Sequence, residues 1–461
     1  MTLLWRKDSK PEKMMESLAE RIFVYKELIK IMKRRTFLRD VGIMVAGASI
    51  IPMNSGCGWK NPNNLITIGM IGVGSHGVGR NLSHYLKYPE LCRVVAVCDV
   101  SMSRAISAKN LVNNTYKSKD CKVYQDFREL LENKSIDAVQ ISTPDHWHVP
   151  ISIMSALKGK HVCCEKPTLT IDEGRLLCDV INKTGVVYQV SVEDRFLPTY
   201  HKMAEIALNG RLGVLRHIEI SLPINLLPKK GLEVTIPPKD LDYDLWLGPA
   251  PEIPFIYSRT FYHFRWYNAF SGGLLTDWGA HYCDTAQLVT GNEFSGPLEV
   301  TPAGETLYYN DGIFNTAYQF DLQYRYANNV TMRVASGNCL IRLEGDEGWV
   351  KSSGWINKLA ASNDKVLDLT EKKVVLPTAN DEFINFLESI KAGRKAIYSA
   401  ESGHRTSSLL HCGNIALKLN RKVEWNPLNE SFVNDPEAEK FRKREMREKW
   451  SYSKICPGYK Y

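Results

Sequence analysis

A glycine-rich turn between a strand and a helix is the feature that most constrains the fold. An apolar run, residues 66–71, leads into Gly72-Val-Gly74-Ser75-His76-Gly77 and then into a helical pattern. In a βαβ unit such glycines allow a tight turn and a close backbone approach to a pyrophosphate at the helix N-terminus. We therefore predict a dinucleotide-binding domain, with cofactor-binding residues Gly72, Gly74, Ser75, His76 and Gly77.

An acidic residue at the end of the next strand-like run points to the same ligand. The run RVVAVCDV contains Asp99, 22 residues beyond Gly77. A carboxylate at this place accepts hydrogen bonds from the hydroxyls of the adenine ribose. Because it would repel a 2′-phosphate, we expect NAD rather than NADP, although Arg104 lies close enough in sequence to favour NADP.

The pattern of apolar runs divides the chain into two domains. Strand-like and helix-like segments alternate over residues 64–196, which predicts a Rossmann domain with a doubly wound parallel sheet. Residues 197–434 carry alternating runs such as TAYQFDLQYRY, which predict an α/β domain with an open, largely antiparallel sheet that could present one face to the cofactor. We expect the basic tail, residues 435–461, to be solvated surface.

The N-terminal segment has the character of an export signal. Two adjacent arginines in KRRTFLRD precede a thirteen-residue apolar run, which predicts a twin-arginine signal over residues 32–57 and a periplasmic protein whose partner during export is the translocase. Cys57 is a candidate for lipidation, and residues 1–31 are a leader extension or a mispredicted start. A cytoplasmic location is the alternative.

Charge and cysteine content argue against a nucleic-acid-binding protein and against a disulfide-stabilised one. The net charge of +8 comes from the two ends, +5 in residues 1–56 and +3 in residues 435–461. The body of the chain is near neutral, which argues against a nucleic-acid partner. The eleven cysteines form no CxxC pair, so we expect residues such as Cys98, Cys163 and Cys164 to be small buried side chains rather than disulfide partners.

The stretch GGLLTDWGAHYCD is the strongest candidate for chemistry outside the first domain. It spaces Asp277, His281 and Asp284 by four and three residues, so a helix would carry all three on one face. Such a set could bind a divalent metal, form an acid/base pair, or simply pack at a helix start. The residues alone leave these three interpretations open.

The order of the motifs resembles the glucose–fructose oxidoreductase, inositol dehydrogenase and rhizopine-catabolism (Gfo/Idh/MocA) family. The motifs are GVGSHG, STPDHWH, EKP at residues 165–167, and GGLLTDWGAH. The later runs LDYDLWLGPAP and ESGHRTSSLLHCGNIALKLNRKVEW are similar to its exported branch. The resemblance implies a Rossmann domain, a second α/β domain, and NAD(P)-dependent activity on sugars, polyols or their derivatives.

The resemblance also assigns roles to individual residues. It implies a catalytic set of Lys166, Asp277 and His281, with His281 the first choice for proton transfer and Lys166 its rival. The resemblance implies that the site holds no metal and that Asp284 has a structural role. The same residues and Arg265 are the candidates for substrate binding. The further candidates for cofactor binding are Thr143, Pro144, Trp147, His148, Glu165 and Lys166.

Three functions follow as hypotheses. The first is an oxidoreductase that acts on a secondary hydroxyl or ketone of a sugar, polyol or glycoside with a tightly bound, recycled NAD. The second is an NAD-dependent glycosidase that works by transient oxidation and elimination. The third is a sugar-binding protein without catalysis. We also expect a homo-oligomer formed through the C-terminal sheet.

Overall fold

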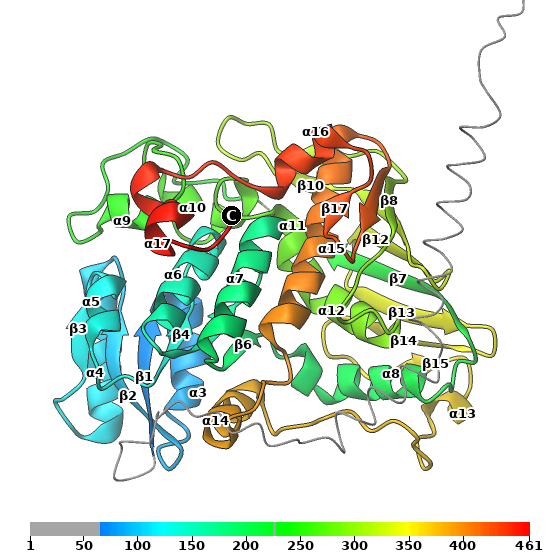
Figure 1. Cartoon of the computed structure of the whole chain (residues 1–461), viewed down its shortest axis with the longest axis horizontal. Coiled ribbons are helices and arrows are strands. Elements are labelled where there is room, and N and C mark those ends of the chain that lie inside the picture. Colours follow the sequence, from blue (N-terminus) through cyan, green and yellow to red (C-terminus); the bar gives the residue numbers. More distant parts are fainter. Residues whose placement is uncertain (1–64, 225–226) are drawn as a thin grey trace, which may run out of the picture. The chain divides into compact units, whose positions relative to one another are not determined.

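The first half of the described chain is a six-stranded parallel sheet enclosed by helices. The computed structural model describes residues 65–224 and 227–461, which lie in one unit, Asn61–Tyr461 (Figure 1). The strand order is β3-β2-β1-β4-β5-β6, and all neighbours run parallel. The strands are β1 (Ile66–Ile71), β2 (Cys92–Cys98), β3 (Lys122–Tyr124), β4 (Ala138–Ile141), β5 (His161–Glu165) and β6 (Tyr188–Ser191). The predicted Rossmann sheet is confirmed.

This strand order determines where a ligand can bind. The order reverses between β1 and β4, and parallel sheets bind ligands in the crevice at the carboxyl ends of the strands at such a point. The helices of this half are η1 (Gly77–Leu82), α3 (Ser83–Tyr85), α4 (Met102–Tyr116), α5 (Phe127–Glu132), α6 (Asp145–Leu157) and α7 (Ile171–Thr184). The side chains of Asp126 and Thr170 cap the N-termini of α5 and α7.

The second half contains a nine-stranded sheet in the order β15-β14-β13-β7-β12-β11-β8-β16-β17. The β7–β12 pair is parallel and the other pairs are antiparallel, as predicted. Its strands are β7 (Leu215–Pro223), β8 (Glu299–Pro302), β11 (Asp321–Arg325), β12 (Thr331–Gly337), β13 (Leu340–Gly345), β14 (Trp349–Ser353), β15 (Ala360–Ala361), β16 (Val423–Asn426) and β17 (Ser431–Phe432). A separate antiparallel pair consists of β9 (Leu307–Tyr308) and β10 (Ala317–Gln319).

Helices α8, α12 and α15 pack on this sheet and form the largest hydrophobic core with it. The helices of this half are α8 (Pro198–Leu208), α9 (Tyr243–Leu247), α10 (Tyr257–Thr260), α11 (Gly273–Asp277), α12 (Gly279–Val289), α13 (Asp364–Leu367), α14 (Glu382–Ala392), α15 (Ala400–Leu419), α16 (Pro436–Glu439) and α17 (Tyr452–Ile455). Short turns lie at η2 (Asp194–Phe196), η3 (His263–Trp266), η4 (Lys440–Arg442) and η5 (Glu448–Trp450).

The C-terminal sheet does not line the crevice, which corrects one expectation. The cavity at the carboxyl ends of β1, β2, β4 and β5 is lined from the second half by α11, α12 and residues 241–265, and by Trp355 between β14 and β15. No residue of the described strands β7–β17 lines it. The helices separate sheet and cavity because the apolar face of the sheet packs against them.

The basic tail is also not solvated surface as expected. Trp450, Tyr452 and Cys456 are buried in a core cluster of the Rossmann half. Arg444 donates to Glu173 on α7 over 2.6 Å, and Tyr452 donates to the same carboxylate over 2.6 Å. The aromatic residues of the tail supply the apolar surface that holds it on α6 and α7, which its basic composition conceals.

Two smaller expectations concern cysteines and membranes. The ten cysteines of the described chain are free thiols, and Cys98, Cys163 and Cys164 are buried as expected. Among residues 65–224 and 227–461, no helix is both long and apolar enough to cross a bilayer. The predicted export signal and Cys57 lie outside the described residues.

Candidate active site

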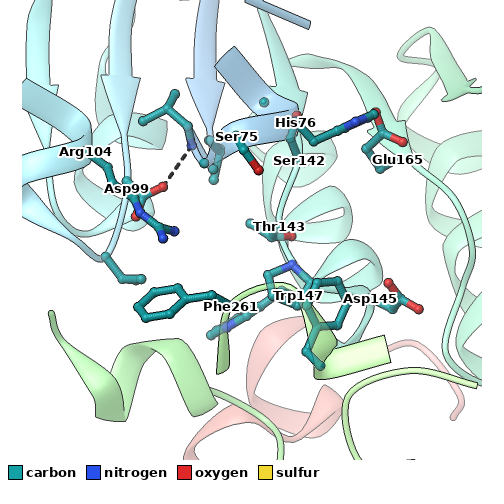
Figure 2. A pocket seen from close by; sticks show the side chains of 18 of the residues that line it. Ser75, His76, Asp99, Arg104, Ser142, Thr143, Asp145, Trp147, Glu165 and Phe261 are labelled. Carbon is teal, nitrogen blue, oxygen red and sulfur yellow. Dashed lines mark hydrogen bonds and ion pairs between the residues drawn. The ribbon is translucent and has the colours of Figure 1, made fainter. Parts of the chain in front are cut away.

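A cavity of about 1130 Å³ occupies the crevice and brings the predicted site together. Every residue proposed above for cofactor, catalysis or substrate lines it. Figure 2 shows Asp99 and Arg104 at one end, and His76 and Glu165 at the other. The volume exceeds that of ordinary small-ligand pockets, so the cavity has room for a dinucleotide and a sugar together.

The glycine turn has the geometry that a pyrophosphate requires. Gly72 adopts φ +85°, and a Cβ there would lie 2.7 Å from the backbone of Ser142. A Cβ on Gly77 would lie 2.2 Å from the carbonyl oxygen of Gly72, so this glycine permits close packing of helix against strand. The nearest atom to a Cβ on Gly74 is 3.5 Å away, so this position faces the cavity. The residues fit a bound dinucleotide.

The adenosine end is built around Asp99. Its two carboxylate oxygens accept the backbone N–H groups of Val73 and Ser101, each over 2.9 Å. These bonds orient the carboxylate toward the cavity, and each oxygen retains a lone pair for a ribose hydroxyl. The guanidinium of Arg104 lies 4.3 Å from the ring centre of Phe261, a residue of the second half (Figure 2). The two halves therefore meet across this end of the cavity.

A segment of the second half, residues 240–266, covers the adenosine end, and we call it the cover segment. Asp240 accepts from the hydroxyls of Ser101 and Ser103 over 2.8 and 2.6 Å. Its backbone oxygen accepts from Met102 N over 3.0 Å, and Leu241 forms a β-bridge with Ser101. These contacts fasten the cover segment to the loop that follows Asp99.

The tail holds the cover segment from the other side. Asp244 pairs with Arg447 and Lys449 over 2.7 and 2.6 Å. Trp450 packs edge-on against Trp147, which lines the cavity, with ring centres 4.8 Å apart. Trp147 also donates its indole N–H to the carbonyl oxygens of residues 245 and 246 over 3.1 Å. The covered end is thus fastened at several separate points.

The STPDHWH motif divides into cavity-lining and supporting residues. Pro144 and the Thr143 hydroxyl line the cavity, and this buried hydroxyl has no partner among the described residues, so it is available to a cofactor. His148 holds the carbonyl oxygens of Thr143 and Pro167 at its two ring nitrogens, each over 2.8 Å. His148 also lines the cavity, and these two bonds make it a support for the backbone around Thr143 and Lys166. His146 is buried and bonds to Trp246 O over 2.9 Å.

The EKP motif places a charged pair at the nicotinamide end. Lys166 Nζ lies 2.5 Å from Asp277 Oδ1, and Arg265 Nε lies 3.4 Å from the same oxygen. Burial would raise the pKa of Asp277, but Lys166 and then Arg265 outweigh it and hold the pKa well below its usual range. Glu165 bonds to His76 over 2.9 Å. Asp277 is therefore an anion whose charge is balanced within the site.

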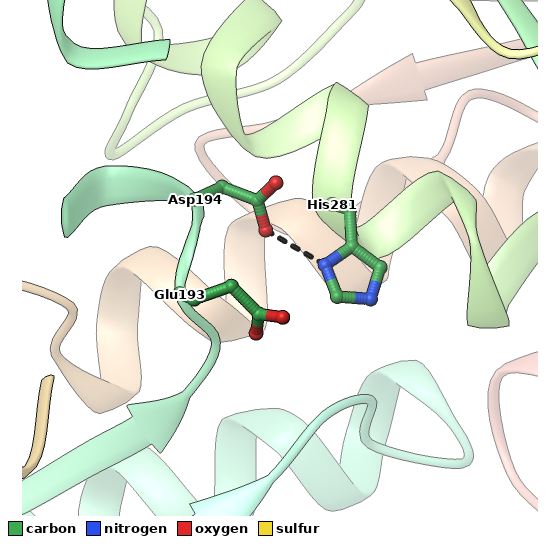
Figure 3. A group of neighbouring side chains, drawn as sticks. All are labelled: Glu193, Asp194 and His281. Carbon is green, nitrogen blue, oxygen red and sulfur yellow. Dashed lines mark hydrogen bonds and ion pairs between the residues drawn. The ribbon is translucent and has the colours of Figure 1, made fainter. Parts of the chain in front are cut away.

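His281 has a partner that sequence reasoning missed. Its Nδ1 lies 2.7 Å from Oδ2 of Asp194, which is completely buried (Figure 3). Burial raises the pKa of Asp194, and His281 opposes this rise. When Nδ1–H donates its hydrogen bond to the Asp194 carboxylate, the neutral ring has its free lone pair on Nε2. Nε2 can then accept a proton. The signal available in the sequence was an acidic pair, Glu193-Asp194, directly after a Rossmann strand.

The three acidic and histidine residues of the GGLLTDWGAHYCD stretch contact different partners and do not converge on one metal. Asp277 pairs with Lys166, and His281 pairs with Asp194. Asp284 accepts hydrogen bonds from Nε and Nη2 of Arg195, each over 2.7 Å. A different group, Glu193, Asp194 and His281, has ligand atoms within 4.8 Å of one another (Figure 3). Within this group His281 and Asp194 are hydrogen-bonded to each other over 2.7 Å, which is the arrangement of an acid/base pair.

The arrangement suits oxidation of an alcohol or reduction of a ketone. When bound, a nicotinamide cofactor accepts or returns the hydride in such a reaction. His281 can take the hydroxyl proton at Nε2, and Asp194 stabilises the imidazolium that results. Lys166 can donate to the reacting oxygen, and Asp277 can orient Lys166 and accept from a substrate hydroxyl.

Comparison with known proteins agrees with this chemistry. Residues 66–192 match the model of the oxidoreductase family NAD-binding Rossmann fold, and residues 217–452 match that of the oxidoreductase family C-terminal alpha/beta domain. A glycosyl hydrolase family 109 protein of Saccharopolyspora erythraea is 30% identical over 171 residues, which are 33% of this chain and 37% of that protein. The D-glucoside 3-dehydrogenase of Escherichia coli is 29% identical over 149 residues, 32% of this chain and 40% of that protein.

These matches span about a third to a half of the length of the curated relatives. A solved structure of aldose-aldose oxidoreductase from Caulobacter crescentus, complexed with glycerol, aligns over 78% of this chain and 99% of its own. Its TM-score is 0.60 at 18% identity, which shows a shared fold. With both domains matched by the family models, the chain belongs to the Gfo/Idh/MocA family of NAD-binding oxidoreductases.

Proposed function

We propose that this protein oxidises a secondary hydroxyl, or reduces the corresponding ketone, of an uncharged sugar, polyol or glycoside, using a tightly held NAD. The observation that carries the proposal is the Asp194–His281 pair beside the Lys166–Asp277 pair in a cavity of dinucleotide size. The cations Lys166 and Arg265 both lie beside the Asp277 carboxylate. The Glu193 carboxylate also lines the cavity, so two positive side chains face two negative ones. This balance favours substrates without a phosphate or carboxylate group.

The cover segment supports tight retention of the cofactor. Its bonds to Ser101 and Ser103, and those of Asp244 to the tail, must break before the adenosine end can open. A cofactor that leaves slowly must be regenerated in place, by a second substrate or by the product itself. We propose such recycling, which suits a protein exported after folding.

The proposed preference for NAD over NADP rests on Asp99. Both its oxygens are held by backbone N–H groups at the adenosine end, so the negative charge is fixed where a 2′-phosphate would lie. Arg104 is engaged with the Phe261 ring. It would have to leave that ring to neutralise a 2′-phosphate.

A second candidate function is hydrolysis of glycosides by transient oxidation, elimination and reduction. The similarity to a glycosyl hydrolase family 109 protein favours it. The first reaction step is the same as in the leading proposal, so the two functions share His281 and Lys166. They differ in whether the substrate loses its aglycone.

One experiment tests both functions. The full chain is purified without added nucleotide, its bound nucleotide is identified by mass spectrometry, and glycosides with a chromogenic aglycone are added. We expect near-stoichiometric NAD and reduction of that nucleotide by a glycoside or polyol. Aglycone release without net reduction would select the hydrolase, and a protein that binds sugars but reduces no nucleotide would contradict both.

Two further proposals concern the setting of the protein. Residues 32–57, which lie outside the described residues, carry the paired arginines that motivate export by the twin-arginine route, with lipidation at Cys57 as an option. The C-terminal sheet motivates a homo-oligomer, because strands such as β7, β11 and β13 alternate buried with less buried residues, which leaves the second face of the sheet for another copy. Cell fractionation and light scattering test these two proposals.

A further inference from the structure

A carboxylate next to the His281 pair has no role in the oxidation described above. Glu193 lines the cavity, and its side chain is 32% exposed. Its carboxylate lies within 4.8 Å of the ligand atoms of Asp194 and His281. Figure 3 shows Glu193 and Asp194 on the same turn, with the side chains of both pointing toward the His281 ring. A substrate that reaches His281 therefore comes close to Glu193.

Glu193 shares the guanidinium of Arg80 with a second, buried carboxylate. Arg80 Nη2 lies 2.9 Å from Glu193 Oε2, and the same guanidinium contacts Glu382 over 2.6 Å. Burial raises the pKa of Glu382 to about 7, against the opposing effect of Arg80. Of these two carboxylates, Glu382 is nearly inaccessible, whereas Glu193 is open to the cavity. Glu193 is thus the one of the two that can reach a substrate as a proton acceptor.

We propose that Glu193 is a second proton-transfer residue, which removes the proton from the carbon next to the oxidised carbon. The inference rests on the proposed function, since that C–H bond is acidic only after the neighbouring hydroxyl has become a ketone. It also defines a substrate class. These substrates are sugar derivatives whose leaving group is on the carbon next to the one that loses the proton. Simple dehydrogenation needs one proton-transfer group, whereas elimination needs a second.

The elimination balances in atoms and electrons. Glu193 takes the proton, the C–H electron pair forms a carbon–carbon double bond, and the bond to the leaving oxygen breaks with its electron pair. The leaving oxygen receives the proton that His281 took from the hydroxyl. Water then adds to the carbon that lost the leaving oxygen, and Glu193 returns its proton to the neighbouring carbon. Finally, His281 carries the second proton of the water to the ketone oxygen as the hydride returns. The sum is hydrolysis.

Deuterium exchange tests this role with the full chain and its retained nucleotide. The protein is incubated in D2O with 4-nitrophenyl glycosides and the matching methyl glycosides. NMR measures deuterium at the carbon next to the oxidised one, and absorbance measures aglycone release and single-turnover nucleotide reduction. We expect Glu193→Gln to lower exchange and aglycone release by ~10²–10⁴-fold, while nucleotide reduction falls by less than roughly tenfold.

Two further variants make the result specific. Glu193→Asp keeps a carboxylate and should recover part of the exchange, and Glu388→Gln on α14 is a matched control outside the cavity. Parallel loss of exchange and nucleotide reduction in Glu193→Gln overturns the inference. So does a wild-type protein that reduces its nucleotide without exchange, in which case the proposed oxidoreductase function stands. A wild-type protein that no glycoside reduces overturns the proposed function and this inference with it.

Discussion

Replacing Asp194 with Asn tests the proton-transfer pair most directly. The variant keeps the shape of the side chain and an oxygen that can accept from His281 Nδ1, but it removes the negative charge. The carboxylate is completely buried, and His281 is 12% exposed, so solvent screens the pair weakly. Hydrogen bonds with a charged partner contribute about 1.5–3 kcal/mol, and neutral ones about 1 kcal/mol. The charge is therefore worth about 0.5–2 kcal/mol to the transition state.

This difference corresponds to a roughly 2–30-fold lower rate of nucleotide reduction, since a tenfold change costs about 1.4 kcal/mol. The assay is single-turnover reduction of the bound nucleotide across a range of pH. Asp120→Asn at an exposed site is the control. An unchanged rate of nucleotide reduction in Asp194→Asn would refute the role of this pair.

Three more predictions concern the cofactor and stability. Asp99→Ser should raise NADP affinity relative to NAD by at least ~10-fold in equilibrium binding, and an unchanged ratio would assign the preference to another group. Asp240→Ala should make nucleotide dissociation roughly tenfold faster in stopped-flow fluorescence, whereas the exposed control Glu233→Ala should not. Equal dissociation rates in Asp240→Ala and the unmodified protein would exclude a role of the cover segment in retaining the nucleotide. Burial lowers the pKa of His146 from 6.5 to about 3, so the unfolded chain binds the extra proton between these values and stability falls as pH falls. Between pH 7.5 and 5 this residue should cost about 2 kcal/mol in urea unfolding, a loss that His146→Asn should lack.

Much of the cofactor site was predictable because its elements are adjacent in sequence. The Gly72–Gly77 turn and Asp99 belong to one βαβ unit, in which strand length and turn geometry determine where each residue lies. The alternation of strands and helices likewise predicted the parallel sheet. The family motifs added Lys166, Asp277 and His281, which all line the cavity with the glycine turn.

Contacts between distant segments were decided by tertiary structure. Asp194 and His281 are 87 residues apart, and they meet because α12 packs against the turn that follows β6. The cover segment reaches Ser101 from 139 residues away. Periodicity describes which face of an element is buried, and it carries no information on which distant face that element meets.

The tail is the clearest example of this limit. Eight basic residues in 435–461 suggest a solvated segment, but Trp450 and Tyr452 are buried against the Rossmann half. The composition of the sequence by itself determined the charge of this segment and the presence of its aromatic residues. Its position was decided by the fold, because α6 and α7 together present an apolar surface and the Glu173 carboxylate that Arg444 and Tyr452 satisfy.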